Sequence, residues 1–218
     1  MTIFFQKELE KIKRLILSLG AMVEERMRLA IRAIKDGDME IAETVIKSDY
    51  EIDEKEVEVE EECLKILALY QPVAVDLRFL IAVIKINNDL ERIADEAVNI
   101  AQRVANITGK QDGAFSFDYS RMSEITEDML KKSLDALVNL DVDLAFKVVT
   151  LDDNVDELHA TAYDLIKKEM RKTPDKAGSL INLYLISRHL ERIADHATNI
   201  AEEVIYLVEG EIVRHGNY

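Results

Sequence analysis

The stretch LERIADEAVNIA at residues 90–101 recurs as LERIADHATNIA at residues 190–201, with ten of the twelve positions identical. Neither copy contains glycine or proline, so each is expected to lie within an uninterrupted helix. Both copies place a glutamate and an aspartate four residues apart, and residues at this spacing share one face of a helix. The repeated acidic helix indicates that a larger part of the chain is duplicated.

The duplication extends upstream of this helix. Residues 37–53 align with residues 140–156 at an offset of 103, and further matches lie just before them. Each half of the chain therefore carries the same three segments in the same order. The matched residues of the middle segment are Asp38, Ala42, Val45, Asp49 and Asp53 in the first half and Asp141, Ala145, Val148, Asp152 and Asp156 in the second.

The apolar residues of the repeated helix alternate steps of three and four residues, which is the heptad spacing of closely packed helices. The middle segment and the first segment, from about Phe5 to Lys35, carry similar stripes. The chain has only 7 glycines and 2 prolines, and no segment competes with the period of a strand. The heptad positions are Val83, Ile86, Leu90, Ile93, Ala97, Ile100 and Val104, and Leu183, Ile186, Leu190, Ile193, Ala197, Ile200 and Val204.

Helix breakers divide each half into three helices. The sequence Lys-Asp-Gly-Asp at 35–38 is expected to end the first helix and cap the second. Pro72 and Pro174 separate the second helix from the third in the two halves. Residues 108–120 hold two glycines and several polar residues, so they are the best linker between the halves.

The predicted fold is all-α, with six long helices arranged as two tandem, pseudo-symmetric three-helix bundles. The first bundle is assigned to residues 1–108 and the second to residues 116–218, each of a common domain size. Short connections make successive helices antiparallel, so each bundle runs up, down and up.

Charge and cysteine content limit the possible partners and compartment. The formal net charge of −15 disfavours nucleic acid and nonspecific binding to anionic lipid, and it suits cations or a basic partner surface. Cys63 is the only cysteine, so no disulfide forms within the chain, which fits a reducing cytoplasm. The first residues, MTIFFQKELEKIKR, do not have the pattern of a secretion signal, and no apolar run is long enough to span a bilayer.

The acids of the first half lie at equal distances on either side of Pro72. Asp53 precedes Pro72 by as many residues as Glu91 follows it, and the same equality holds for Asp49 and Asp95. Antiparallel helices with arms of equal length place such residues at the same height. Four carboxylates should therefore meet on this hairpin.

The second hairpin repeats this register around Pro174. Asp156 and Glu191 are equally far from Pro174 to within one residue, and so are Asp152 and Asp195. The second hairpin is three residues shorter, but the deletion lies in the loop and leaves the acids in register.

Carboxylates gathered at one height repel one another, and bound cations would remove that repulsion. Oxygen ligands suit hard cations, and paired carboxylates also bridge transition metals in di-iron bundles. We therefore predict one metal-binding patch in each half. The predicted ligands are Asp49, Asp53, Glu91 and Asp95 in the first half and Asp152, Asp156, Glu191 and Asp195 in the second.

Each patch is expected to be a shallow surface groove, because Leu90 and Ile93 occupy the apolar seam and Glu91 then points away from it. The alternative is an ordinary solvated face, in which Arg92 and Arg192 pair with the aspartates three residues further on. The spacing alone leaves both interpretations open.

Each of the other polar residues near the patches has two possible roles. His159 follows Asp156 by three residues, so it either extends the second patch toward softer metals or is a half-exposed helix residue. Asn99 and Asn199 either serve as ligands or bond between helices. The sequence holds no nucleophile constellation, no Gly-rich phosphate loop and no Cys-x-x-Cys, so no catalytic residue is predicted.

Two long stretches, residues 71–101 and residues 187–215, resemble the PhoU family, whose members are accessory and regulatory proteins of the bacterial phosphate-specific transport system. The likeness covers nearly the whole chain, including the duplication. The family's motif, an acid followed four residues later by Asp, falls on Glu91 with Asp95 and on Glu191 with Asp195, with Asp49, Asp53, Asp152 and Asp156 as their partners.

This resemblance implies two three-helix bundles that bind divalent or transition metal ions, chiefly iron or zinc, on their surface. It implies a cytoplasmic protein, often a homodimer, that is a negative regulator of the phosphate-starvation response and of phosphate uptake. The implied partners are the ATP-binding subunit of the phosphate transporter and a membrane sensor histidine kinase, with no nucleic acid and with membrane contact only through these partners.

A metal-binding signalling adaptor that is not an enzyme is the leading interpretation. The alternative is a carboxylate-bridged metalloenzyme, which needs a dry pocket and perturbed acids beside an open metal position. A third possibility is a structural helical spacer, which would take up no metal.

Overall fold

The computed structural model describes residues 3–108 and 116–211, and it contains no strand among these residues. Within the same ranges no helix is both long enough and apolar enough to cross a membrane. The elements are α1 (Ile3–Asp36), α2 (Met39–Lys47), α3 (Tyr50–Tyr70), α4 (Ala74–Thr108), α5 (Ser120–Asn139), α6 (Val142–Lys172), the short 3-10 helix η1 (Pro174–Lys176) and α7 (Ala177–Glu209).

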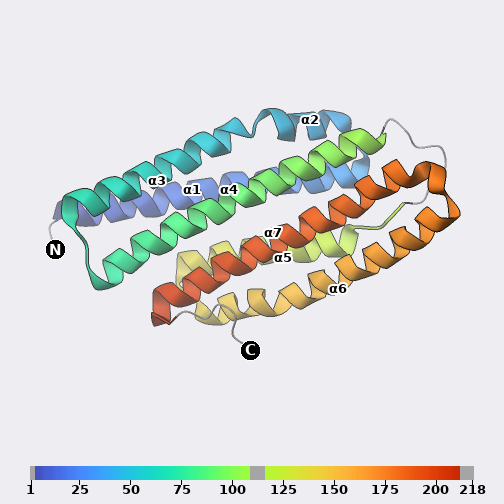
Figure 1. Cartoon of the computed structure of the whole chain (residues 1–218). Helices are drawn as coiled ribbons and strands as arrows, with labels where there is room; N and C mark the ends of the chain where they lie inside the picture. Colours follow the sequence, from blue (N-terminus) through green and yellow to red (C-terminus); the bar gives the residue numbers. More distant parts are fainter. Residues whose placement is uncertain (1–2, 109–115, 212–218) are drawn as a thin grey trace.

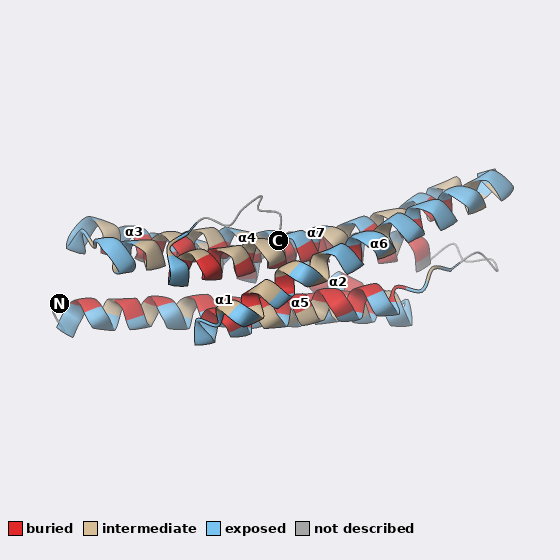
Figure 2. Cartoon of the chain, turned by 90° about the horizontal axis from the view of Figure 1, so that it is seen from below, coloured by how far each residue is buried: buried red, intermediate tan, exposed pale blue. Residues whose placement is uncertain are grey.

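The helices form two layers. The helices α3, α4, α7 and α6 lie side by side in one layer, and α1 and α5 lie behind them (Figure 1, Figure 2). The segments α1 to α4 make one bundle, and α5 to α7 make the other. The predicted all-α fold of two pseudo-symmetric three-helix bundles is confirmed. The predicted linker between the halves lies partly at residues 109–115, outside the described residues.

The two bundles share one continuous apolar core, and the buried residues face the space between the layers (Figure 2). All the predicted heptad positions of α4 and α7 are buried. These two helices run antiparallel through the centre of the molecule and make the most extensive helix contact in the described structure (Figure 1). Buried alanines let the two backbones approach closely, and they include Ala94, Ala101, Ala194 and Ala201.

A glycine in α1 allows close packing against α5. Gly20 is buried in α1, and a Cβ at this position would meet a methyl group of Leu134 in α5 at 2.9 Å. The missing side chain therefore allows α1 and α5 to approach each other across the junction between the halves.

One predicted helix is interrupted. The second helix of the first half ends at Lys47 and restarts at Tyr50, whereas its counterpart α6 is continuous. The side chain of Arg26, buried in α1, donates hydrogen bonds to the carbonyl oxygens of Val45 at 3.5 Å and Ser48 at 3.1 Å. The same two carbonyl oxygens also accept from the Glu51 amide and the Ser48 hydroxyl, so Arg26 adds to the hydrogen bonds that hold the chain at the break. The position equivalent to Arg26 in the second half is the buried, apolar Met129.

The turns that start the second helix of each half differ in one residue. Gly37 adopts a left-handed conformation with φ 62°, and Asp38 then accepts backbone hydrogen bonds at the start of α2. The predicted end of the first helix and cap of the second are confirmed. In the second half Leu140 takes the glycine position with φ 52°, and Asp141 caps α6.

Candidate metal centres

The four acids of the first half lie where the α2–α3 break faces α4. Asp49 occupies the N-cap position of α3, but its side chain makes no capping hydrogen bond. Its Oδ1 atom is buried and has no hydrogen-bond partner among the described residues. A buried carboxylate oxygen without a donor is costly, so this atom is free to accept a cation.

The charges of these acids act on one another across the two helices. Partial burial, followed by repulsion from Asp53 and Asp95, raises the pKa of Asp49, while the Arg26 guanidinium opposes the rise. Partial burial and the charge of Asp53 likewise raise the pKa of Asp95. Burial and the charge of Asp95 raise the pKa of Glu91, to which Asp53 also contributes. The hairpin therefore brings acids of both arms together.

The second half repeats this arrangement with stronger effects. Burial and repulsion from Asp195 and Asp156 raise the pKa of Asp152 to about 7, and the Thr198 hydroxyl beside it opposes the rise. Burial, then the charges of Glu191 and Asp156, raise the pKa of Asp195 to about 6. Burial and Asp156 also raise the pKa of Glu191.

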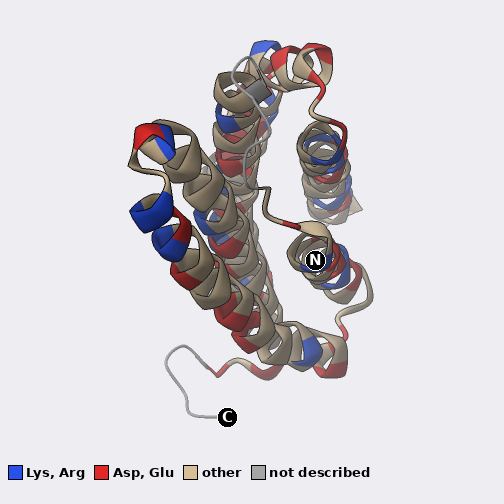
Figure 3. Cartoon of the chain, turned by 90° about the vertical axis from the view of Figure 1, so that its right-hand side faces the viewer, with Lys and Arg blue, Asp and Glu red and all other residues tan. Residues whose placement is uncertain are grey.

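Each patch is open to solvent on one side. Asp53, Asp95, Asp156 and Asp195 are exposed, and the other four acids are half-buried. Acidic side chains recur along the helices, in keeping with 43 acidic and 28 basic residues in the chain (Figure 3). The patches thus lie at the surface and not inside the bundles.

The acids are paired, but they do not form a closed cage. Across residues 3–108 and 116–211, no three His, Cys, Asp or Glu side chains stand close enough together to make a ready metal-ligand set. Two features of these residues nevertheless suit a cation. The carboxylates repel one another, and Asp49 Oδ1 has no hydrogen-bond partner among the described residues. Exposed carboxylates have the rotamer freedom to close around an ion.

Arg92 and Arg192 do not form the ion pairs with Asp95 and Asp195 that an ordinary solvated face would have. Arg92 donates from Nε to Asn88 Oδ1 at 3.2 Å, and Arg192 reaches Glu96 at 3.5 Å. The positive charges of both arginines still oppose the rise in the pKa of Asp95 and Asp195. They therefore moderate the repulsion in the patches without neutralising it.

The remaining polar residues join helices. The Nδ1 atom of His159 lies 3.1 Å from Ser187 Oγ, and its ring packs on Tyr184, so this histidine is a half-buried contact of α6 with α7. Asn199 donates to Asp89 at 3.1 Å across the junction between the halves, and Asn99 reaches Glu96 on its own helix at 3.4 Å. For Asn199, the interpretation as a bond between helices is confirmed.

Sequence reasoning missed a polar junction between α4 and α7. Nδ1 of His189 lies 2.6 Å from Glu96, and Nδ1 of His196 lies 2.9 Å from Asp89. The repeat relates these pairs, because Asp89 and Glu96 stand at the positions of His189 and His196. The sequence signal for this junction was that the second repeat has histidine where the first has an acid, at two positions seven residues apart.

Comparisons with known proteins agree with this fold and duplication. The family model described as the PhoU domain matches the chain twice, at residues 16–104 and 119–204. A phosphate-specific transport system accessory protein PhoU homolog from Pseudomonas aeruginosa is 38% identical over 214 residues, which cover 97% of this chain and 88% of the relative. A homolog of the same name from Aquifex aeolicus is 40% identical over 209 residues, covering 96% of this chain and 95% of the relative.

Solved structures show the same architecture. The crystal structure of PhoU from Pseudomonas aeruginosa superposes with a TM-score of 0.92 at 36% identity, covering 95% of this chain and all of that one. The structure of the phosphate transport system regulatory protein PhoU from Streptococcus pneumoniae gives a TM-score of 0.86 at 30% identity, covering 96% and 99% of the two chains. The chain described here therefore belongs to the PhoU family.

Proposed function

We propose that this chain is a regulatory accessory protein of a phosphate-specific transport system and that it binds metal ions at its two acidic patches. The relatives named above support the first part, since they are accessory and regulatory proteins of that system. The observation that carries the second part is the pairing of acids across two helices in both halves.

The proposed ligands are the predicted acids of each patch. Iron or zinc is the proposed metal because the family resemblance implies it, and paired carboxylates bridge iron in di-iron bundles. A bound divalent ion would supply positive charge that offsets the repulsion between the acids. The chain's own contribution is to hold each pair of acids on opposite helices at one height. The pairs are Asp49 with Asp95 and Asp53 with Glu91 in the first half, and Asp152 with Asp195 and Asp156 with Glu191 in the second.

The proposed regulation is negative and works by protein contact. In this proposal the chain is cytoplasmic, acts as a homodimer, and passes phosphate status between the ATP-binding subunit of the transporter and a sensor histidine kinase. The two-layer helical surface offers long accessible faces for such contacts (Figure 1). The expected consequence is that phosphate-responsive genes stay repressed in high phosphate only when the protein is present.

A deletion strain tests this function. Loss of the chain should make phosphate-responsive genes constitutive, and the wild-type chain should restore repression. Complementation with a variant carrying Glu91→Ala, Asp95→Ala, Glu191→Ala and Asp195→Ala asks whether the acids are needed. Normal repression in the deletion strain would refute the regulatory role, whereas full repression by the variant would separate regulation from metal binding.

The alternative function is a carboxylate-bridged metalloenzyme. The raised pKa values of Asp152 and Asp195 are a feature that such an enzyme shares. The relatives are named as transport accessory proteins, which favours the adaptor. A turnover assay of metal-loaded protein with simple esters, phosphate esters and oxygen separates the two, because only the enzyme gives product above the metal-free control.

A further inference from the structure

The repeat creates a groove at each end of the junction between the two halves. The first groove, of about 560 Å³, lies where α1 ends and α5 begins, and its lining includes Ile34, Lys35 and Gly37. The second groove, of about 480 Å³, lies where α4 begins and α7 ends, and its lining includes Leu137, Val138 and Leu140. These two sets of residues are equivalent at the offset of 103, so the grooves are related by the duplication.

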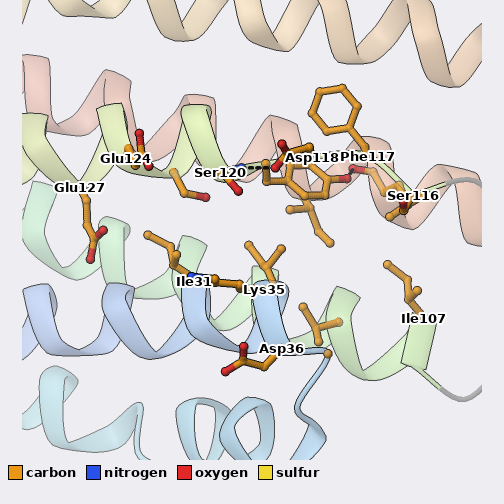
Figure 4. A pocket seen from close by; sticks show the side chains of 17 residues that line it. Ile31, Lys35, Asp36, Ile107, Ser116, Phe117, Asp118, Ser120, Glu124 and Glu127 are labelled. Atoms are coloured by element: carbon orange, nitrogen blue, oxygen red, sulfur yellow. Dashed lines mark hydrogen bonds between the residues drawn. The ribbon is translucent and has the colours of Figure 1, made fainter.

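The first groove has a lining of polar and apolar residues in similar measure, and a buried tyrosine forms part of its wall. Tyr119 is buried there and donates its hydroxyl proton to the carbonyl oxygen of Leu183 at 2.5 Å. Phe117 packs edge-on against the Tyr119 ring, with ring centroids 4.9 Å apart. Charged residues surround the opening (Figure 4), including Lys35, Asp36, Asp118, Glu124 and Glu127.

The second groove is more apolar than the first. Val138 is 55% exposed and Leu140 is 53% exposed, although the equivalent positions in the first groove are Lys35 and Gly37. Leu140 also has a left-handed backbone, which costs a residue with a side chain about 1–2 kcal/mol. Its exposed side chain and its backbone are therefore both unfavourable in the isolated chain. Further apolar lining comes from Leu17, Val75, Phe79, Leu207 and Val208.

Two cations line the second groove in a chain of net charge −15. The Lys13 ammonium lies 5.9 Å from the centre of the Phe79 ring and bonds to Glu10. The guanidinium of Arg78 lies against Gly210 at the C-terminal end of α7, and its Nε atom has no partner among the described residues. Asp76 is the acidic residue of the lining. The groove is thus an apolar site with two cations and one acid in its lining, on a chain that is acidic overall.

We propose that the second groove docks the apolar face of an amphipathic helix from another protein, with acidic residues beside that face. A groove between near-parallel helices accepts a helix as its occupant, with anchors spaced at i, i+3, i+4 and i+7. Acidic flanking residues would pair with Lys13 and Arg78. A flat anionic membrane fits less well, since the apolar residues line a concave surface and the chain as a whole is acidic. This docking does not depend on metal binding at the acidic patches.

The decisive variant replaces the groove residues by those of its own repeat. Val138→Lys combined with Leu140→Gly installs the residues that the first half carries at the same turn, so the fold should be kept, as circular dichroism can verify. Lys35→Gln, at the equivalent position of the first groove, is the matched control. Lys13→Gln removes one rim charge and tests the charge complementarity.

The probe is a phage-displayed library of 18-residue helical peptides selected on the wild-type chain. Selected peptides should carry an apolar stripe with Asp or Glu beside it, and the double variant should weaken their binding at least tenfold. The Lys35→Gln control should bind within twofold of wild type. Lys13→Gln should weaken acidic peptides severalfold and leave their Gln-substituted versions unchanged.

Several results would overturn the proposal. Failure to enrich any peptide, equal binding to the wild type and the double variant, or selection of peptides without acidic residues would each do so. A concentration-dependent dimer that dissociates in the double variant would assign the groove to a second copy of this chain. Binding to phosphatidylglycerol vesicles that the double variant abolishes would assign it to a membrane.

Discussion

Arg26 and Met129 occupy equivalent positions in the two halves, and only Arg26 bonds to the helix pair that follows it. Its guanidinium supports the break between α2 and α3 and also opposes the rise in the pKa of Asp49 that burial and the neighbouring acids cause. The apolar Met129 leaves α6 continuous, and Asp152, the counterpart of Asp49, has its pKa raised to about 7. The difference between Arg26 and Met129 therefore adds to the difference in burial that separates the two acidic patches electrostatically.

Arg26→Met should lower the free energy of unfolding by about 1–3 kcal/mol, because it removes the hydrogen bonds of the buried guanidinium to the carbonyl oxygens of Val45 and Ser48 and its ion pair with Glu51. Urea denaturation followed by circular dichroism measures this change. Met129→Leu, which keeps an apolar residue of similar volume, should cost less than about 1.5 kcal/mol. Equal losses in the two variants would show that Arg26 acts only by filling space.

The metal-free protein should lose stability as the pH rises from about 4 to 7. The ordinary pKa of Asp152 is 3.8 and its folded pKa is about 7, so in this window the folded chain binds more protons than the unfolded chain. Asp152→Asn should flatten this dependence and stabilise the metal-free protein at pH 8 by about 1 kcal/mol, a value discounted because solvent screens the half-buried group.

Thermal unfolding across this pH range, with chelator present, makes the measurement. The exposed Asp164 on the same helix supplies the control, since Asp164→Asn should leave the pH dependence unchanged. Two results together would contradict the repulsion described for the second patch. The metal-free wild type would become more stable from pH 4 to pH 7, and Asp152→Asn would show the same pH dependence.

The left-handed turn at Leu140 gives a prediction about stability alone. Leu140→Gly should leave the free energy of unfolding unchanged or raise it by up to about 1 kcal/mol, because relief of the backbone strain slightly exceeds the entropy cost of glycine. The reverse change Gly37→Leu, at φ 62°, should destabilise by up to about 1 kcal/mol, because the same two effects act with opposite sign. A clear loss of stability in Leu140→Gly would mean that the exposed leucine packs favourably in the free chain.

The polar junction between α4 and α7 should couple the two halves energetically. Asp89 accepts from Asn199 and lies 2.9 Å from Nδ1 of His196. A double-mutant cycle with Asp89→Ala and His196→Ala should give a coupling energy of about 1 kcal/mol, measured by urea denaturation. The pair Asp164→Ala with His196→Ala has no shared contact and should be additive. If the effects of Asp89→Ala and His196→Ala are also additive, this contact does not help to hold the two halves together.

Much of the fold followed from local periodicity. The heptad positions from Val83 to Val104 are buried, and the turn at Gly37 ends one helix and caps the next. The register of the acids around Pro72 could be counted because short antiparallel connections leave little freedom. These features depend on residues close together in the sequence.

The features that sequence reasoning missed depend on contacts between distant segments. The break before α3 is stabilised by Arg26, which lies 22 residues before Ser48. The contact of His196 with Asp89 spans 107 residues. The second groove is lined by residues from both halves. The helical periodicity of the sequence does not indicate which exposed positions of α4 and α7 lie side by side.

The most direct test of the account is elemental analysis of protein purified without a metal-chelating tag. Wild type should retain several-fold more divalent metal than the variant with Glu91→Ala, Asp95→Ala, Glu191→Ala and Asp195→Ala, with little change in helicity. Two-residue variants of a single half should each lose only the metal of that half. Equal metal content in the wild type and the four-residue variant would contradict the claim that paired acids of each hairpin hold the ions.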